Sequence, residues 1–261
     1  MRLARLLTLA AGLALLLVGG QAWAVSKGEG DLIITFDGGL SPNRLPRHSP
    51  AAVAVRVAGN IKSASGDSLH LPQLRRITVA INRQGRLFDK GLPVCEAEEI
   101  QPATEAAARR ICGPSIVGSG HVTVQVRIPS QSTFDVRAKL LAFNGPRQDG
   151  HKLILAQAYA RKPPGTFILT FRIARRGGTY GTVLSAALPP GSRRWAYLTH
   201  FDMTLHRVYS YRGRRRSYVS AACSAPAGFE KVIFPFARAT YDFATGQRMS
   251  VSETGICRVA G

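Results

Sequence analysis

The chain has 261 residues, of which 45% are hydrophobic, so it can bury the core of one large domain or two small ones. This content excludes a chain too polar to fold around a core. Lysine and arginine number 35 against 15 acidic residues, which gives a formal net charge of +20. Such a charge attracts polyanions in a salt-dependent way, although a codon bias towards arginine and alanine would give the same composition without a specific partner.

The first 24 residues have the features of a secretory signal peptide. Arg2 and Arg5 precede an apolar run from Leu6 to Val18, and Ala22 and Ala24 mark a cleavage site after Ala24. The run of about 13 residues is shorter than the roughly 20 that span a bilayer as a helix, but an uncleaved anchor is the alternative. Cleavage removes two arginines, so the charge falls from +20 to +18. We therefore expect a secreted protein, extracellular or associated with the cell envelope, without a transmembrane span.

From residue 25 onward, apolar and polar residues alternate with period two. In "HVTVQVRI" (121–128), Val122, Val124, Val126 and Ile128 share one face. The segments 53–57 and 75–82 follow the same pattern, with Val53, Val55, Val57, Ile77, Val79 and Ile81 inward. We also expect strands at 31–36, 136–143, 151–160, 166–174, 179–188, 195–211, 217–223, 231–243 and 248–257.

Short alternating runs separated by turn residues indicate an all-β protein. We expect an antiparallel β-sandwich, of jelly-roll or immunoglobulin-like type, that forms a single domain over 25–261. The segment "YARKPPGTF" (159–167) leaves a split into two domains near 161–165 open, and we favour an ordinary loop there.

One segment departs from this pattern and predicts a short helix near 103–112. "ATEAAARRICGP" is rich in helix formers, Thr104 is a suitable N-cap, and Gly113 and Pro114 end the helix. The three nearby glutamates at 96, 98 and 99 are interpreted as solvating this helix.

The four cysteines fit an oxidising compartment. Three pairings are possible, and we favour the nearest-neighbour pairing because it closes two local loops, which contribute roughly 3 and 3.5–4 kcal/mol in the chain-entropy model. A zinc site is excluded by spacing, since no two cysteines are two to four residues apart. The expected disulfides are Cys95–Cys112 and Cys223–Cys257.

The sequence contains no recognisable catalytic, metal or cofactor site. His200, Asp202 and His206 would share one face of a strand, but the two histidines would then stand about 20 Å apart, too far to hold one ion. Ser119 lies between glycines, outside any nucleophile elbow, and we interpret it as part of a turn. No catalytic residue, metal ligand or cofactor is therefore assigned, and an enzyme has no support.

The most basic segment is "YSYRGRRRSYVSAAC" (209–223), which we interpret as a hairpin with a cationic tip. Gly213 is expected to adopt positive φ there, while Tyr209 and Tyr211 face the core and Tyr218 opens the return strand. Export argues against nucleic acid as the partner of this segment. The candidate anion-binding residues are Arg212, Arg214, Arg215, Arg216, Arg193 and Arg194, and further arginine pairs stand at 75–76 and 175–176.

Several blocks of the chain resemble a set of uncharacterised secreted proteins from actinobacterial genomes. These blocks are "RGGTYGTVLSAALP", "YSYRGRRRSYVSAACSAPAGF", "FPFARATYDF", "LLAFNG" and "GLPVC". The resemblance covers residues 31–258 and implies export and a common fold, but it implies no activity and no functional residue.

These observations favour a non-enzymatic binding or structural protein of the cell envelope. It would contact anionic cell-wall polymer or lipid headgroups through its arginine-rich surface. The alternative is an extracellular hydrolase whose active site the sequence does not reveal; it requires His200 or Asp202 to line a pocket beside a second titratable group.

Overall fold

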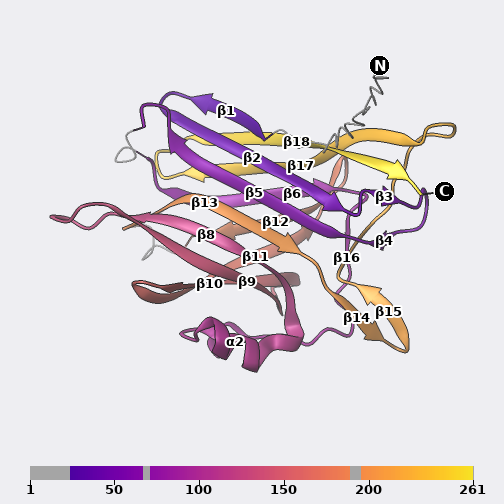
Figure 1. Ribbon diagram of the computed structural model, residues 1–261, viewed down its shortest axis with the longest axis horizontal. Coiled ribbons are helices and arrows are strands. Elements are labelled where there is room, and N and C mark those ends of the chain that lie inside the picture. The colour runs from indigo at the N-terminus through magenta and orange to yellow at the C-terminus, as the bar shows by residue number, and fades with distance from the viewer. Residues whose placement is uncertain (1–23, 67–70, 189–194, 261) are drawn as a thin grey trace, which may run out of the picture.

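A computed structural model describes residues 24–66, 71–188 and 195–260, and it confirms the all-β prediction (Figure 1). The predicted signal peptide, apart from Ala24, lies outside the described residues, as do Arg193 and Arg194. Over the described ranges, no helix has the length and apolar character needed to cross a lipid bilayer.

The main sheet has thirteen strands, which pair antiparallel except where the last two meet. Its spatial order is β1, β2, β5, β13, β8, β9, β10, β11, β12, β6, β17, β18 and β3. In chain order the bounds are β1 Val25–Glu29, β2 Leu32–Ser41, β3 Arg44–Leu45, β5 Ala54–Ser63, β6 Leu74–Asn82, β8 Ile116–Val126, β9 Phe134–Gln148, β10 His151–Arg161, β11 Pro164–Arg175, β12 Tyr180–Ala187, β13 Ala196–Leu205, β17 Lys231–Phe243 and β18 Arg248–Val259.

This sheet curls until its two ends lie face to face (Figure 1). Phe36 of β2 and Phe236 and Tyr241 of β17 are fully or almost fully buried in one hydrophobic cluster between these ends. The two layers expected of a sandwich are thus the two ends of a single sheet. The segment 161–165, where a domain split was left open, is the turn of the β10–β11 hairpin inside this sheet.

The predicted helix is α2, Glu105–Cys112, and the hydroxyl of Thr104 caps it by accepting a hydrogen bond from Ala107 N at 3.2 Å. A short α1, Ala97–Ile100, precedes it, and a 3₁₀ turn, Gly113–Ser115, follows. The two helices cover the outer face of β9 and β10, where Ile100 and Ala108 pack with Leu155 in a second buried cluster. β10 is therefore buried on both faces, which explains its nearly continuous apolar run.

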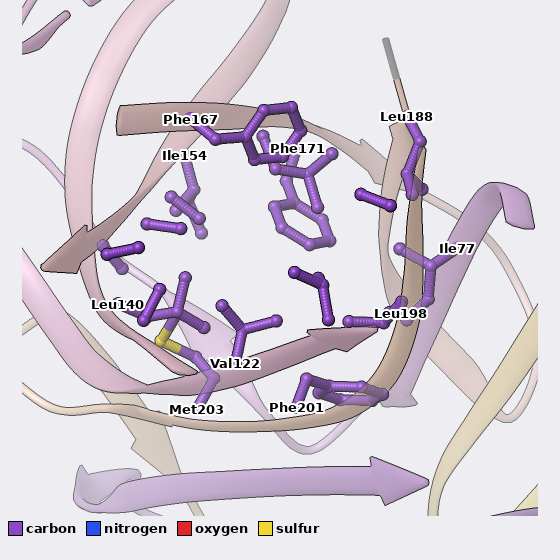
Figure 2. Close-up of a pocket in the computed structure, with 18 of the residues that line it drawn as sticks. Ile77, Val122, Leu140, Ile154, Phe167, Phe171, Leu188, Leu198, Phe201 and Met203 are labelled. Carbon is purple, nitrogen blue, oxygen red and sulfur yellow. The ribbon is translucent and has the colours of Figure 1, made fainter. Parts of the chain in front are cut away.

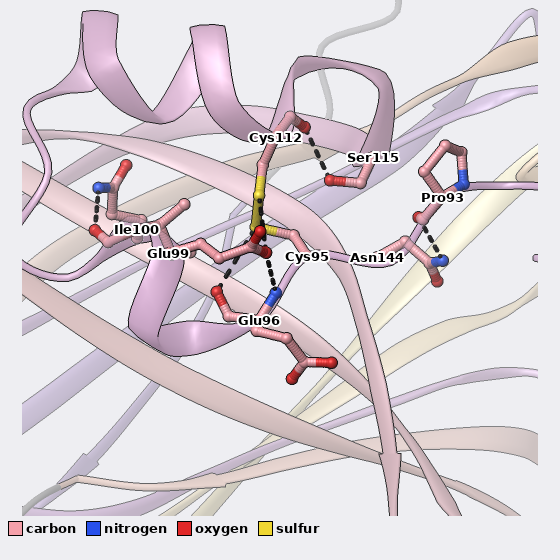
Figure 3. The surroundings of a disulfide bond; sticks show 9 residues. Pro93, Cys95, Glu96, Glu99, Ile100, Cys112, Ser115 and Asn144 are labelled. Atoms are coloured by element: carbon pink, nitrogen blue, oxygen red, sulfur yellow. Dashed lines mark hydrogen bonds between the residues drawn. A yellow bond between two sulfur atoms is a disulfide. The ribbon is translucent and has the colours of Figure 1, made fainter.

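Both disulfides join the predicted partners, and Figure 3 shows the Cys95–Cys112 bond. Cys95–Cys112 connects the segment before α1 to the end of α2, with Cα atoms 5.6 Å apart. Cys223–Cys257 connects the segment after β16, Val219–Ala221, to β18. Strand β16 pairs with β4, Ala51–Ala52, and β7, Arg86–Leu87, in a small separate sheet.

Two local expectations were wrong. The expected strand 195–211 is interrupted at residues 206–207, and β14, Val208–Tyr211, instead forms a hairpin with β15, Arg214–Ser217. Ser119 lies inside β8 and not in a turn. The glycines on either side of it are needed because a Cβ at Gly118 or Gly120 would collide with the backbone of β13.

Candidate ligand-binding cavity

The inner side of the curled sheet encloses an apolar cavity of about 380 Å³ (Figure 2). Eight consecutive strands of the sheet, from β5 through β13 and β10 to β6, supply its wall. All residues of β5, β6 and β8 that were predicted to face inward are part of this wall. Val53 and Ile128 were also predicted to face inward, but they lie just outside the strands and do not line the cavity. Thr166 is the one polar side chain among the described residues that line the cavity.

The cavity exists because one part of its wall is built from alanine. Ala138 and Ala142 of β9 and Ala156, Ala158 and Ala160 of β10 alternate along their strands and point inward. Facing strands carry larger side chains, and Figure 2 shows several of these around an open centre. A wall of methyl groups cannot reach across this space, so the sheet is curled around a void instead of a packed core.

The cavity is closed at one end and accessible at the other. At the closed end, Val55, Ala142 and Leu205 are buried. At the other end, which we call the mouth, Val126 and Ala196 remain only partly buried although both line the cavity. The β10–β11 turn, at residues 162–165, also lies at the mouth and is exposed.

The wall has one junction without backbone pairing, which we call the seam. Neighbouring strands are hydrogen-bonded from β5 round to β6, but β5 and β6 do not pair with each other. Side chains fill this junction: Phe201 of β13 and Tyr241 of β17 both lie against Gly59 of β5. A Cβ at Gly59 would stand 2.6 Å from Phe201 Cε1 and 2.7 Å from Tyr241 Oη. Between β5 and β6 themselves, the seam is therefore closed by side-chain packing and not by a backbone ladder.

The predicted basic hairpin is present with positive φ at Gly213, but its return strand is β15, Arg214–Ser217, so the expectation that Tyr218 opens that strand was wrong. Arg212 and Gly213 form its tip with φ of 51° and 70°, the two positive values that a type I′ turn requires. Tyr209 donates hydrogen bonds to the carbonyls of Phe88 and Lys90, at 3.1 and 2.9 Å. The tyrosines of this hairpin thus anchor it to the body of the protein and are not free to stack on bases.

The candidate anion-binding arginines of the hairpin are exposed, and none forms an ion pair with a carboxylate in the described part of the chain. Arg212 and Arg216 lie over the rings of Tyr211 and Phe88, at 5.4 and 5.5 Å. The hairpin follows Leu205, so it stands at the closed end of the cavity, away from the mouth. It is separate from the cavity site.

His200 and Asp202 lie on the outer face of β13, where neither lines the cavity. The Nδ1 of His200 is 2.8 Å from Asn60 Oδ1. Arg56 bridges two carboxylates, with Nη1 2.7 Å from Asp37 Oδ2 and Nη2 2.5 Å from Asp202 Oδ2. This arrangement commits the Asp202 carboxylate to an ion pair instead of presenting it beside a reactive group in a pocket.

Among the described residues, one group of potential metal ligands is compact: Cys95, Glu99 and Cys112. The two sulfurs are bonded to each other, so neither is available as a thiolate (Figure 3). Glu99 Oε2 accepts a hydrogen bond from Glu96 N at 2.8 Å, which ties the carboxylate to the start of α1. The three residues therefore form a disulfide and part of the capping box of α1.

Comparisons with family models, with curated proteins and with solved structures find no match for this chain. The likeness to uncharacterised secreted proteins stays a prediction, and the function must be inferred from the cavity. Sequence reasoning missed this site, although the alternating alanines of β9 and β10 were a visible signal for it.

Proposed function

We propose that this protein binds a molecule with a single apolar chain inside the curled sheet. The observation that carries the proposal is the cavity, whose wall is apolar apart from Thr166 and whose mouth is accessible. Ligand pockets have volumes of roughly 300–1,000 Å³ and mostly apolar walls. The two disulfides are compatible with action outside the cytoplasm, as a carrier or a storage protein.

The size of the cavity favours one chain over two. A cavity of roughly 150 Å³ accepts benzene, with six carbon atoms, so by proportion a cavity of about 380 Å³ holds about 15 non-hydrogen atoms. This matches one medium-length chain. Since each buried methylene contributes about 0.8 kcal/mol, affinity should rise about fourfold per methylene until the cavity is full.

The test uses neutral ligands, so that charge plays no part. The mature protein is titrated with N-phenyl-1-naphthylamine, whose fluorescence increases in apolar surroundings, and the probe is then displaced with octanol, decanol, dodecanol and tetradecanol. We expect displacement that strengthens with chain length. Absence of probe binding, or displacement independent of chain length, would contradict the proposal.

The matched variant is Ala158→Phe, which places a ring in the cavity, and its control is Ala174→Phe on the outer face of β11. We expect Ala158→Phe to lose probe binding by more than tenfold while Ala174→Phe retains it. Far-ultraviolet circular dichroism and thermal unfolding show whether each variant is folded. Ala160→Leu, nearer the mouth, is the second filling variant should Ala158→Phe misfold.

A second candidate function is contact with an anionic surface of the cell envelope through the β14–β15 hairpin. It is favoured by the four exposed arginines, which no carboxylate neutralises among the described residues. We expect retention on vesicles rich in phosphatidylglycerol to fall as salt rises from about 50 to about 500 mM. Replacing Arg214, Arg215 and Arg216 by glutamine should reduce it several-fold, whereas salt-independent retention would exclude this role.

A further inference from the structure

A basic pocket, open to solvent, lies beside the mouth of the apolar cavity. Arg75 and Arg76 at the start of β6 line it together with Arg248 at the start of β18. Leu188 belongs to both sites: it lines the cavity, at whose edge Figure 2 labels it, and it also lines the basic pocket. Its amide donates a hydrogen bond to the Arg75 carbonyl at 2.9 Å, which holds the two sites together.

The basic pocket has an excess of positive charge. Arg248 Nε is 3.2 Å from Asp242 Oδ1, so these two charges largely offset each other. Arg75 and Arg76 form no ion pair with a carboxylate in the described part of the chain. The pocket therefore combines three guanidinium groups with one carboxylate and leaves two guanidinium groups for an anion.

We propose that the ligand is an amphiphile, with its chain in the cavity and a compact anionic head in this basic pocket. The inference rests on the proposed function and adds to it the chemical class of the ligand. Because Arg76 alternates with the inward-facing Ile77, the basic pocket opens on the outer side of the wall, and Leu188 marks where a chain that leaves the mouth reaches it. A molecule with an apolar chain followed by an anion fits this succession of sites. Carboxylate and phosphate heads share this chemistry, since arginine binds both in bidentate geometry.

The experiment compares three ligands of equal chain length at about pH 8: dodecanol, dodecanoate and dodecyl phosphate. Each displaces the neutral probe N-phenyl-1-naphthylamine from the protein. We expect one or both anions to bind about fivefold more tightly than the alcohol at low salt, and this preference to shrink as salt is added. The anion that the protein prefers more strongly over dodecanol shows whether the ligand is a fatty acid or a phosphate ester.

Two variants change the charge of the pocket in opposite directions. The double variant Arg75→Gln/Arg76→Gln should abolish the preference for anions and leave dodecanol affinity unchanged. Asp242→Asn frees Arg248 and should increase the preference. The control Arg110→Gln/Arg147→Gln removes the same number of positive charges from exposed positions of α2 and the end of β9, outside both proposed sites, so it should leave the preference as it is.

The possible outcomes separate this inference from the proposed function. Binding of dodecanol without any preference for the anions overturns the inference and leaves the proposed function standing. A preference that survives Arg75→Gln/Arg76→Gln places the anion elsewhere and also overturns it. If neither the probe nor any of the three ligands binds, the proposed function fails as well.

Discussion

The alanines of β9 and β10 set the volume of the cavity one side chain at a time. Each replacement by leucine would add three carbon atoms to the interior, so a few such changes would convert the cavity into a packed core. Packed interiors are the usual outcome for curled sheets, because empty apolar space forfeits dispersion contacts. Five inward alanines on two adjacent strands therefore leave this region open, as the proposed binding site requires, instead of filling it as core.

Glu253 of β18 is a buried carboxyl group that lies outside the cavity. Burial raises its pKa, the neighbouring Asp37 carboxylate raises it further, and Oε2 has no hydrogen-bond partner. Because the folded-state pKa lies above the unfolded one, the stability that the protonated form provides is complete below the unfolded pKa. It is lost as pH rises through the folded pKa.

We therefore expect Glu253→Gln to stabilise the protein at pH 7 by about 1 kcal/mol, because the neutral amide carries no charge to bury beside Asp37. The gain should shrink towards pH 4, where Glu253 itself is protonated. Urea unfolding at the two pH values measures the difference, with the exposed Glu230→Gln as the control. Equal stabilisation at both pH values would show that ionisation of Glu253 is not the cause.

At the scale of elements, the α1–α2 segment acts as an external cover for the cavity wall. Gln157 of β10 points outward into it and donates hydrogen bonds to the carbonyls of Ile100 and Ala103, at 2.7 and 2.9 Å. The sequence predicted the position of α2 and its Thr104 cap, because capping and helix propensity are local properties. It did not predict which strands the helix covers, since that depends on the order of strands in space.

The Cys95–Cys112 disulfide holds this cover closed, and its removal should expose β10. Replacing both cysteines by alanine should lower the free energy of unfolding by about 3 kcal/mol, as expected for a loop of 17 residues. Hydrogen exchange should accelerate first in α1, α2 and the outer face of β9 and β10. Unchanged exchange in these elements, with only global destabilisation, would show that the helices stay in place without the disulfide.

At the scale of the whole molecule, the sequence predicted faces but not the shape that the faces enclose. Alternation correctly assigned Val122 and Ile77 to the interior, because the period-two pattern is a local property of each strand. The enclosure arises from pairings such as β5 with β13 and β12 with β6, whose partners are about a hundred residues apart or more in the chain. No local pattern specifies such pairings.

Because long-range pairing is not visible in the sequence, the relative positions of the arginine clusters could not be predicted either. In sequence they suggested a single basic face, but the structure places Arg75 and Arg76 beside the mouth and the β14–β15 hairpin at the closed end. Two basic regions at opposite ends can serve two different contacts, one with a bound molecule and one with a surface.

The seam between β5 and β6 makes the wall of the cavity compliant along one line. Every other junction between wall strands is a ladder of backbone hydrogen bonds, which resists separation. Between β5 and β6 the seam is filled by side chains such as Phe201 and Tyr241, and an aromatic ring can slide over Gly59 without breaking a hydrogen bond of the ladder. We therefore expect any widening of the wall around a bound chain to begin along this line, while the strands on either side keep their register.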